Sequence, residues 1–125
     1  MRYPAFLPPN GTLGFVAPSF GCATEPYKSA FLNAQKIWEK EGYRILTGPN
    51  CYVESGIGIS NTPSACGKEL QDFYCMQEND CLISCGGGEL MCEILDYVDF
   101  EKIKEAEPKW YMGYSDNTNM TFLLA

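Results

Sequence analysis

Ser115 is the residue whose type and neighbours most favour covalent chemistry. It lies in the segment GYSDN, residues 113–117, between an apolar run and a segment with helical character. A serine on a tight turn between a strand and a helix is typical of a nucleophile elbow, where free N–H groups of the following helix stabilise an oxyanion. The Asp116 N–H is the natural first donor. Because Asn117 replaces the second glycine of the Gly-x-Ser-x-Gly pattern, helix capping by Ser115 or Asp116 is the alternative interpretation.

Three consecutive glycines, Gly86, Gly87 and Gly88, form a second candidate feature. Glycines let the backbone approach a ligand, and a helix that starts just afterwards favours a negative group. The spacing does not match GxGxxG and no P-loop lysine is present, so a dinucleotide site is not indicated. We expect a second oxyanion donor from Gly86 or Gly87 and a substrate contact from Gly88; a tight turn without a ligand is the alternative. Ser19 is a further candidate substrate contact, or an ordinary turn serine.

The overall composition limits the chemistry and the partners. There is no histidine, so His-dependent catalysis must take its general base from elsewhere. Sixteen acidic and nine basic residues give a net charge of −7 with no basic stripe, which excludes nucleic acid as a partner. No apolar run approaches the roughly 20 residues of a membrane helix. Seven cysteines without a CxxC pair favour reduced, buried thiols in a cytoplasmic protein, and we expect no metal and no cofactor.

The elements that position these residues alternate along the chain. With 125 residues, of which 46% are hydrophobic, the chain fits one globular domain. Apolar runs predict strands at residues 12–17, 43–47, 81–85 and 110–112. Helical periodicity and capping residues predict helices at residues 26–42, from 62 to about 79, 89–95, in part of 96–107, and from about 117 onward. The apolar stripe of the first helix is predicted to be core; it comprises Tyr27, Phe31, Ala34 and Trp38.

This alternation predicts an α/β domain, with a parallel sheet covered by helices on both faces. Functional loops of such sheets lie at the carboxyl ends of the strands. Ser19, the three glycines and Ser115 all fall at such ends. We therefore expect them to meet at one edge of the sheet.

Ala17-Pro18-Ser19, the triple glycine and the segment GYSDNT, residues 113–118, together resemble the LD-carboxypeptidase family of serine peptidases, which includes microcin C immunity hydrolases. The resemblance implies a flavodoxin-like or class I glutamine amidotransferase-like layered domain. It implies that Ser115 is the nucleophile of a Ser-His-Glu triad, with an oxyanion hole formed by Gly86 or Gly87 and by Asp116. The family's Glu and His come from a C-terminal domain, so residues 1–125 are expected to be the N-terminal, nucleophile-bearing domain of a truncated chain.

The resemblance further implies hydrolysis of the amide between an L-centre and a terminal D-amino acid, typically in murein tetrapeptides, through an acyl-enzyme. Cys85 and Cys66 stand where the family often has arginine. An immunity-type hydrolase of peptidyl or aminoacyl nucleotides is one alternative, and a non-enzymatic flavodoxin-like module that binds an anion is another. The apolar, uncapped residues 121–125 indicate exposed surface, and we expect a homodimer.

Overall fold

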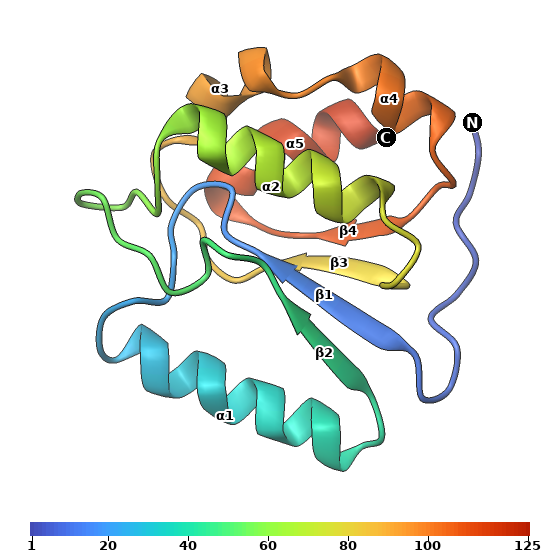
Figure 1. Ribbon diagram of the computed structural model, residues 1–125, viewed down its shortest axis with the longest axis horizontal. Coiled ribbons are helices and arrows are strands. Elements are labelled where there is room, and N and C mark those ends of the chain that lie inside the picture. The colour runs from blue at the N-terminus through green and yellow to red at the C-terminus, as the bar shows by residue number, and fades with distance from the viewer.

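The computed structural model describes residues 1–125 and contains a single parallel sheet. Its strands are β1 (Thr12–Val16), β2 (Arg44–Thr47), β3 (Cys81–Ser84) and β4 (Trp110–Met112), in the order β2-β1-β3-β4 (Figure 1). The central β1 is buried throughout, and its Leu13 pairs with Ile45 on one side and Cys81 on the other. The parallel α/β fold is therefore confirmed, with each strand within one residue of its predicted ends.

Helices lie on both faces of the sheet, as predicted. The helices are α1 (Tyr27–Lys40), α2 (Pro63–Cys75), α3 (Met91–Ile94), α4 (Phe100–Glu105) and α5 (Thr118–Leu124), with 3-10 turns η1 (Leu95–Tyr97) and η2 (Ser115–Asn117). Figure 1 shows α1 alone on one face and α2 to α5 on the other. On the α1 face, β3 and β4 have no helix over them, and hydrophobic side chains there line an open groove of about 310 Å³. None of the helices is both long and apolar enough to cross a lipid bilayer.

Local sequence explains where α2 begins and ends. Thr62 accepts a hydrogen bond from the Ala65 N–H, and Pro63 occupies the first helical position, where its missing N–H has no cost. The helix ends at Cys75, earlier than predicted, because Met76 adopts an extended conformation. Asn79, predicted as the helix end, instead lies buried beyond it and donates from its side chain to the Phe73 carbonyl.

The core has one cluster on each face of the sheet. The α2 face packs twelve buried residues, among them Val16, Leu70, Leu82, Met91 and Met120. On the α1 face, Phe31 packs edge-on against Phe15, with ring centroids 5.2 Å apart. The predicted aromatic stripe of α1 is wrong except at Phe31, since Tyr27 is 54% exposed and Trp38 is 37% exposed. With no neighbouring helix on this face, only the side of α1 that touches the sheet is buried.

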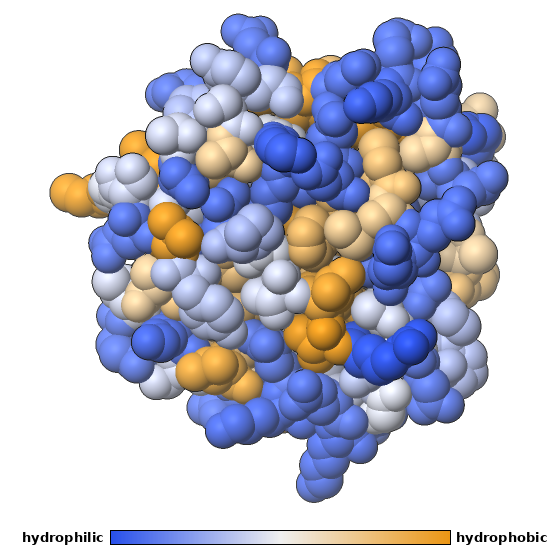
Figure 2. Space-filling model, viewed as in Figure 1, coloured by the Kyte–Doolittle hydropathy of each residue, from blue (hydrophilic) through white to orange (hydrophobic).

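The outer surface is largely polar, as the charge balance leads one to expect. On the face shown in Figure 2, hydrophilic residues predominate and hydrophobic ones gather near the centre. Exposed apolar side chains include Phe6, Ile57, Tyr114 and Phe122. Scattered apolar residues of this kind are normal on protein surfaces.

Candidate active site

Ser115 lies on a strained turn directly after β4. Tyr114 is extended, Ser115 has a φ of 58°, and the chain then enters η2 and α5. A positive φ is uncommon for a residue with a side chain and stores strain, as expected for a nucleophile elbow. Ser115 is exposed and its hydroxyl makes no hydrogen bond within the chain. The hydroxyl is thus free to meet a ligand at the carboxyl end of β4.

The triple-glycine turn lies against this elbow. A Cβ built on Gly87 would be 3.3 Å from Ser115 Cβ and 3.4 Å from Ser115 Oγ. The two features meet because β3 and β4 are neighbouring strands. The backbone N–H groups of Gly86, Gly87 and Gly88 have no acceptor within the chain. Of these unpaired donors, the Gly87 N–H belongs to a residue close to the Ser115 side chain, and the Asp116 N–H lies in the first turn of η2.

Gly88 needs to be glycine for a structural reason. Its φ is +132°, and a Cβ would lie 2.3 Å from Ser19 Oγ and 2.7 Å from the Gly58 carbonyl oxygen. The predicted role of Gly88 as a substrate contact stays a prediction. The observed constraint is close packing of its backbone against the segments that follow β1 and β2.

Ser19 is placed differently from the prediction. Its side chain is fully buried; its hydroxyl donates to Asp116 Oδ2 at 2.5 Å and accepts from the Leu90 N–H at 3.0 Å. This arrangement does not favour a substrate contact, because the side chain has no exposed surface and its hydroxyl proton is donated within the protein. The Asp116 carboxylate also accepts from the Met91 N–H at 2.8 Å. It therefore joins the elbow to the end of β1 and the start of α3.

Asn117, the departure from the glycine pattern, is buried beneath the elbow. Its Nδ2 donates to the Gly86 carbonyl at 2.7 Å and to the Tyr114 carbonyl at 3.2 Å, while its Oδ1 accepts from the Tyr111 hydroxyl at 2.6 Å. A Cβ on Gly113 would lie 2.7 Å from Asn117 Cβ. The glycine at 113 thus provides the space that the Asn117 side chain occupies.

Glu69 is a buried carboxylate that sequence reasoning missed. It is 3% exposed, and it accepts hydrogen bonds from the Ala17 N–H at 2.6 Å and the Asn50 N–H at 2.5 Å. Burial raises the pKa of Glu69 to about 6, although the two backbone bonds act in the opposite direction. The signal was present, since Glu69 shares the helix face of Cys66, Leu70 and Phe73, which are all buried.

No other side chain near the glycine turn offers a ready nucleophile or base. All seven cysteines are free thiols. The Cys22 thiol donates to the Cys85 carbonyl at 3.4 Å, and its interaction with Cys85 and its burial raise its pKa, which keeps the thiol protonated and unreactive. The chain has no histidine, and no carboxylate or amine hydrogen-bonds to Ser115. The chain therefore holds a candidate nucleophile and candidate oxyanion donors without a general base.

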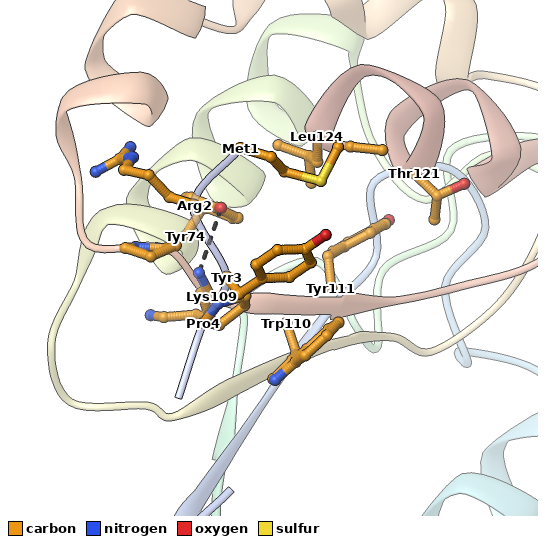
Figure 3. A pocket seen from close by; sticks show the side chains of 12 residues that line it. Met1, Arg2, Tyr3, Pro4, Tyr74, Lys109, Trp110, Tyr111, Thr121 and Leu124 are labelled. Carbon is orange, nitrogen blue, oxygen red and sulfur yellow. Dashed lines mark hydrogen bonds between the residues drawn. The ribbon is translucent and has the colours of Figure 1, made fainter. Parts of the chain in front are cut away.

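A cavity of about 240 Å³ lies near the opposite, amino-terminal end of β4 (Figure 3). The N-terminal segment, Tyr74, the start of β4 and the end of α5 line it. The Lys109 N–H there donates to the Tyr74 hydroxyl at 3.4 Å, and Lys109 Nζ donates to the carbonyls of Phe73 and Met76. None of the predicted site residues lines this cavity, so it is separate from the candidate active site.

Fold and site together define a layered α/β domain with an exposed serine on a strained turn beside a glycine-rich turn. The family model described as LD-carboxypeptidase N-terminal domain matches residues 13–125, and the chain belongs to this family. The resemblance seen in the sequence is thereby confirmed. Among curated protein sequences, none matches the chain significantly.

Solved structures of the same architecture include proteins with different functions. The Microcin C7 self immunity protein MccF is 24% identical with a TM-score of 0.86, covers 96% of this chain, and is known both alone and with aspartyl sulfamoyl adenosine. An MccF-like protein from Bacillus anthracis str. Ames is 19% identical over 94% of this chain, with a TM-score of 0.80. A muramoyltetrapeptide carboxypeptidase from Oxalobacter formigenes is 19% identical over 87%, with a TM-score of 0.69.

These likenesses establish the fold. The chain spans 35%, 35% and 34% of the three solved chains, respectively, or about one third of their length. They do not establish the activity, the substrate or the partners of a whole protein.

Proposed function

We propose that this chain is the nucleophile-bearing part of a serine hydrolase in which Ser115 attacks an amide carbonyl. The observation that carries the proposal is the exposed, unbonded Ser115 hydroxyl on a strained turn in contact with Gly87. Attack forms a bond from Ser115 Oγ to the carbonyl carbon, and the N–H groups of Gly86 or Gly87 and of Asp116 stabilise the resulting oxyanion. Cleavage of the C–N bond leaves an acyl-enzyme ester, which water then hydrolyses.

The proton of the Ser115 hydroxyl needs a base that this chain does not contain. In the proposed reaction a histidine outside the 125 residues takes that proton and passes it to the leaving amine. A serine without such a partner is a poor nucleophile at its free pKa. We therefore expect the 125-residue chain alone to have no peptidase activity, whatever its affinity for substrate.

The proposed substrate is a murein peptide, cut at the amide to a terminal D-amino acid. Membership of the LD-carboxypeptidase family supports this choice, as does the fold shared with a muramoyltetrapeptide carboxypeptidase. A second candidate is an aminoacyl nucleotide. It is favoured by the fuller superposition of MccF, which is solved with aspartyl sulfamoyl adenosine. Homodimerisation and a cytoplasmic location stay predictions from the sequence.

The test uses protein expressed from the complete reading frame, incubated with murein tetrapeptide while released D-alanine is measured enzymatically. We expect release from the parent protein and none from a Ser115→Ala variant with an unchanged circular dichroism spectrum. Unchanged D-alanine release by Ser115→Ala would contradict the proposal, as would a parent protein that neither releases D-alanine from murein peptide nor cleaves aspartyl sulfamoyl adenosine to aspartate. Cleavage of the nucleotide alone would select the second candidate. The 125-residue chain is the negative control.

A further inference from the structure

The Gly86–Gly87 peptide lies between the two halves of the proposed site, and its orientation decides which group faces Ser115. In a planar trans peptide the carbonyl and the following N–H point in opposite directions. The Gly86 carbonyl accepts from Asn117 Nδ2 at 2.7 Å, and Asn117 is 1% exposed beneath the elbow. The Gly87 N–H therefore points away from Asn117, on a residue whose Cβ position would lie 3.4 Å from Ser115 Oγ.

Nothing in the glycine residues themselves fixes this orientation. Rotating the peptide by half a turn changes ψ of Gly86 and φ of Gly87, and glycine populates most of the conformations that such a flip passes through. The flipped form would present a carbonyl oxygen to Ser115, which repels a developing oxyanion. Ser84, the last residue of β3, also donates to the Gly86 carbonyl at 2.8 Å, but it holds this carbonyl to its own strand and not to the elbow. Asn117 is the donor that joins this carbonyl to the elbow.

The chemistry of its neighbours fixes the orientation of the Asn117 amide. Two of its partners, the carbonyls of Gly86 and Tyr114, can only accept, so they require the NH₂ group. The third partner is the Tyr111 hydroxyl, which donates to Asn117 Oδ1. Burial raises the pKa of Tyr111, so this hydroxyl keeps its proton and remains a donor. A rotated amide would lose all three bonds.

We propose that Asn117, oriented by Tyr111, is a positioning residue that holds the Gly86–Gly87 peptide with the Gly87 N–H directed at the carbonyl under attack. This inference rests on the proposed function, because the N–H matters for catalysis only if Ser115 is the nucleophile. It assigns a role to the residue at which the elbow departs from the second glycine of the common pattern. The Asn117 side chain donates a hydrogen bond to the Gly86 carbonyl, which a glycine at this position could not do.

The structural part is tested by NMR on the isotopically labelled 125-residue chain. In the parent chain we expect a scalar coupling across the hydrogen bond between Asn117 ¹⁵Nδ2 and the Gly86 carbonyl ¹³C. In Asn117→Asp a carboxylate oxygen opposes the Gly86 carbonyl, so the residual dipolar coupling of the Gly87 N–H should change while those of β1 and β3 stay constant. Tyr111→Phe should change the dipolar coupling of the Gly87 N–H in the same direction but by a smaller amount. Asn33→Asp, on an exposed face of α1, is the matched control for the added charge.

The catalytic part uses the complete-frame protein. We expect Asn117→Asp to lower kcat about 10²-fold or more with KM nearly unchanged, as for loss of one oxyanion donor. If Asn117→Asp does not fold, the positioning role is decided by the scalar coupling in the parent chain and by the Gly87 dipolar coupling in Tyr111→Phe. Absence of the coupling in the parent chain, or an unaltered Gly87 dipolar coupling in the folded variants, overturns the positioning role. These readouts do not depend on hydrolysis. Inactivity of the parent enzyme would instead count against the proposed function alone.

Discussion

The buried Glu69 carboxylate should make the stability of this protein fall as the pH rises through the weakly acidic range. Its pKa is raised from 4.5 to about 6 in the folded chain, chiefly by burial. Between these two values the folded state therefore binds more protons than the unfolded chain. The contribution of Glu69 to the free energy of unfolding is then highest below pH 4.5 and decreases as the pH rises through 6. The pKa difference corresponds to about 2 kcal/mol.

The assay is urea denaturation of the 125-residue chain and of Glu69→Gln at intervals from pH 4 to pH 8. The difference in unfolding free energy between the two proteins isolates Glu69 from the other carboxylates. As the pH rises, we expect the parent to lose about 2 kcal/mol of unfolding free energy relative to Glu69→Gln, or roughly 1 M in the urea midpoint. Gln should itself be less stable than a protonated Glu by about 1–3 kcal/mol, because its NH₂ group opposes one of the two buried N–H donors.

Glu54→Gln is the matched control, since it also removes one negative charge but from an exposed residue without a side-chain hydrogen bond. It should keep the pH profile of the parent chain. A difference between parent and Glu69→Gln that stays constant within about 0.5 kcal/mol from pH 4 to pH 8 would refute the reasoning. A parent chain that gains stability relative to Glu69→Gln as the pH rises would also refute it, because the two backbone hydrogen bonds to Glu69 would then outweigh burial.

Four further substitutions test the strain of the elbow, the packing of the glycine turn and the cap of α2. Ser115→Gly should raise the free energy of unfolding by about 1 kcal/mol, measured by urea denaturation, because glycine tolerates the φ of 58°; no gain would mean that the turn is unstrained. Gly87→Ala should fold normally but lower hydrolysis by the complete-frame protein about 10²-fold. Gly88→Ala should instead lose about 3 kcal/mol or more of stability, since its Cβ would lie 2.3 Å from Ser19 Oγ. Equal losses of stability in Gly87→Ala and Gly88→Ala would contradict the closer packing around Gly88. Thr62→Ala should lose about 1 kcal/mol of stability with the cap of α2, and an unchanged urea midpoint would show that the cap contributes nothing.

The strands and the meeting of the glycine turn with Ser115 could be predicted from the sequence alone. Short apolar runs ending in glycine, proline or serine determine the strands, and parallel topology brings their carboxyl ends to one edge. That argument needs only local patterns and handedness. It places Gly87 beside Ser115 without any knowledge of side-chain contacts.

The hydrogen-bond network under the site could not be predicted in this way. Ser19 and Asp116 are 97 residues apart in the sequence, and Ala17 and Glu69 are 52 apart, so neither pair leaves a local pattern. A turn serine is compatible with both a substrate contact and a buried partner for Asp116. The exposure of the α1 aromatics has a similar cause, because helical periodicity cannot tell how many helices share a sheet face.

The strained conformation of Ser115 persists because its neighbours are held from several sides. A positive φ at a residue with a side chain costs about 1–3 kcal/mol. Asp116, the next residue, is bonded to both Ser19 and Met91, and Asn117 is bonded to Gly86. Bonds of this kind contribute about 1 kcal/mol each when neutral and about 1.5–3 kcal/mol when a charge takes part. Their sum exceeds the strain, so the buried contacts of residues 116 and 117 suffice to keep the exposed Ser115 hydroxyl in place.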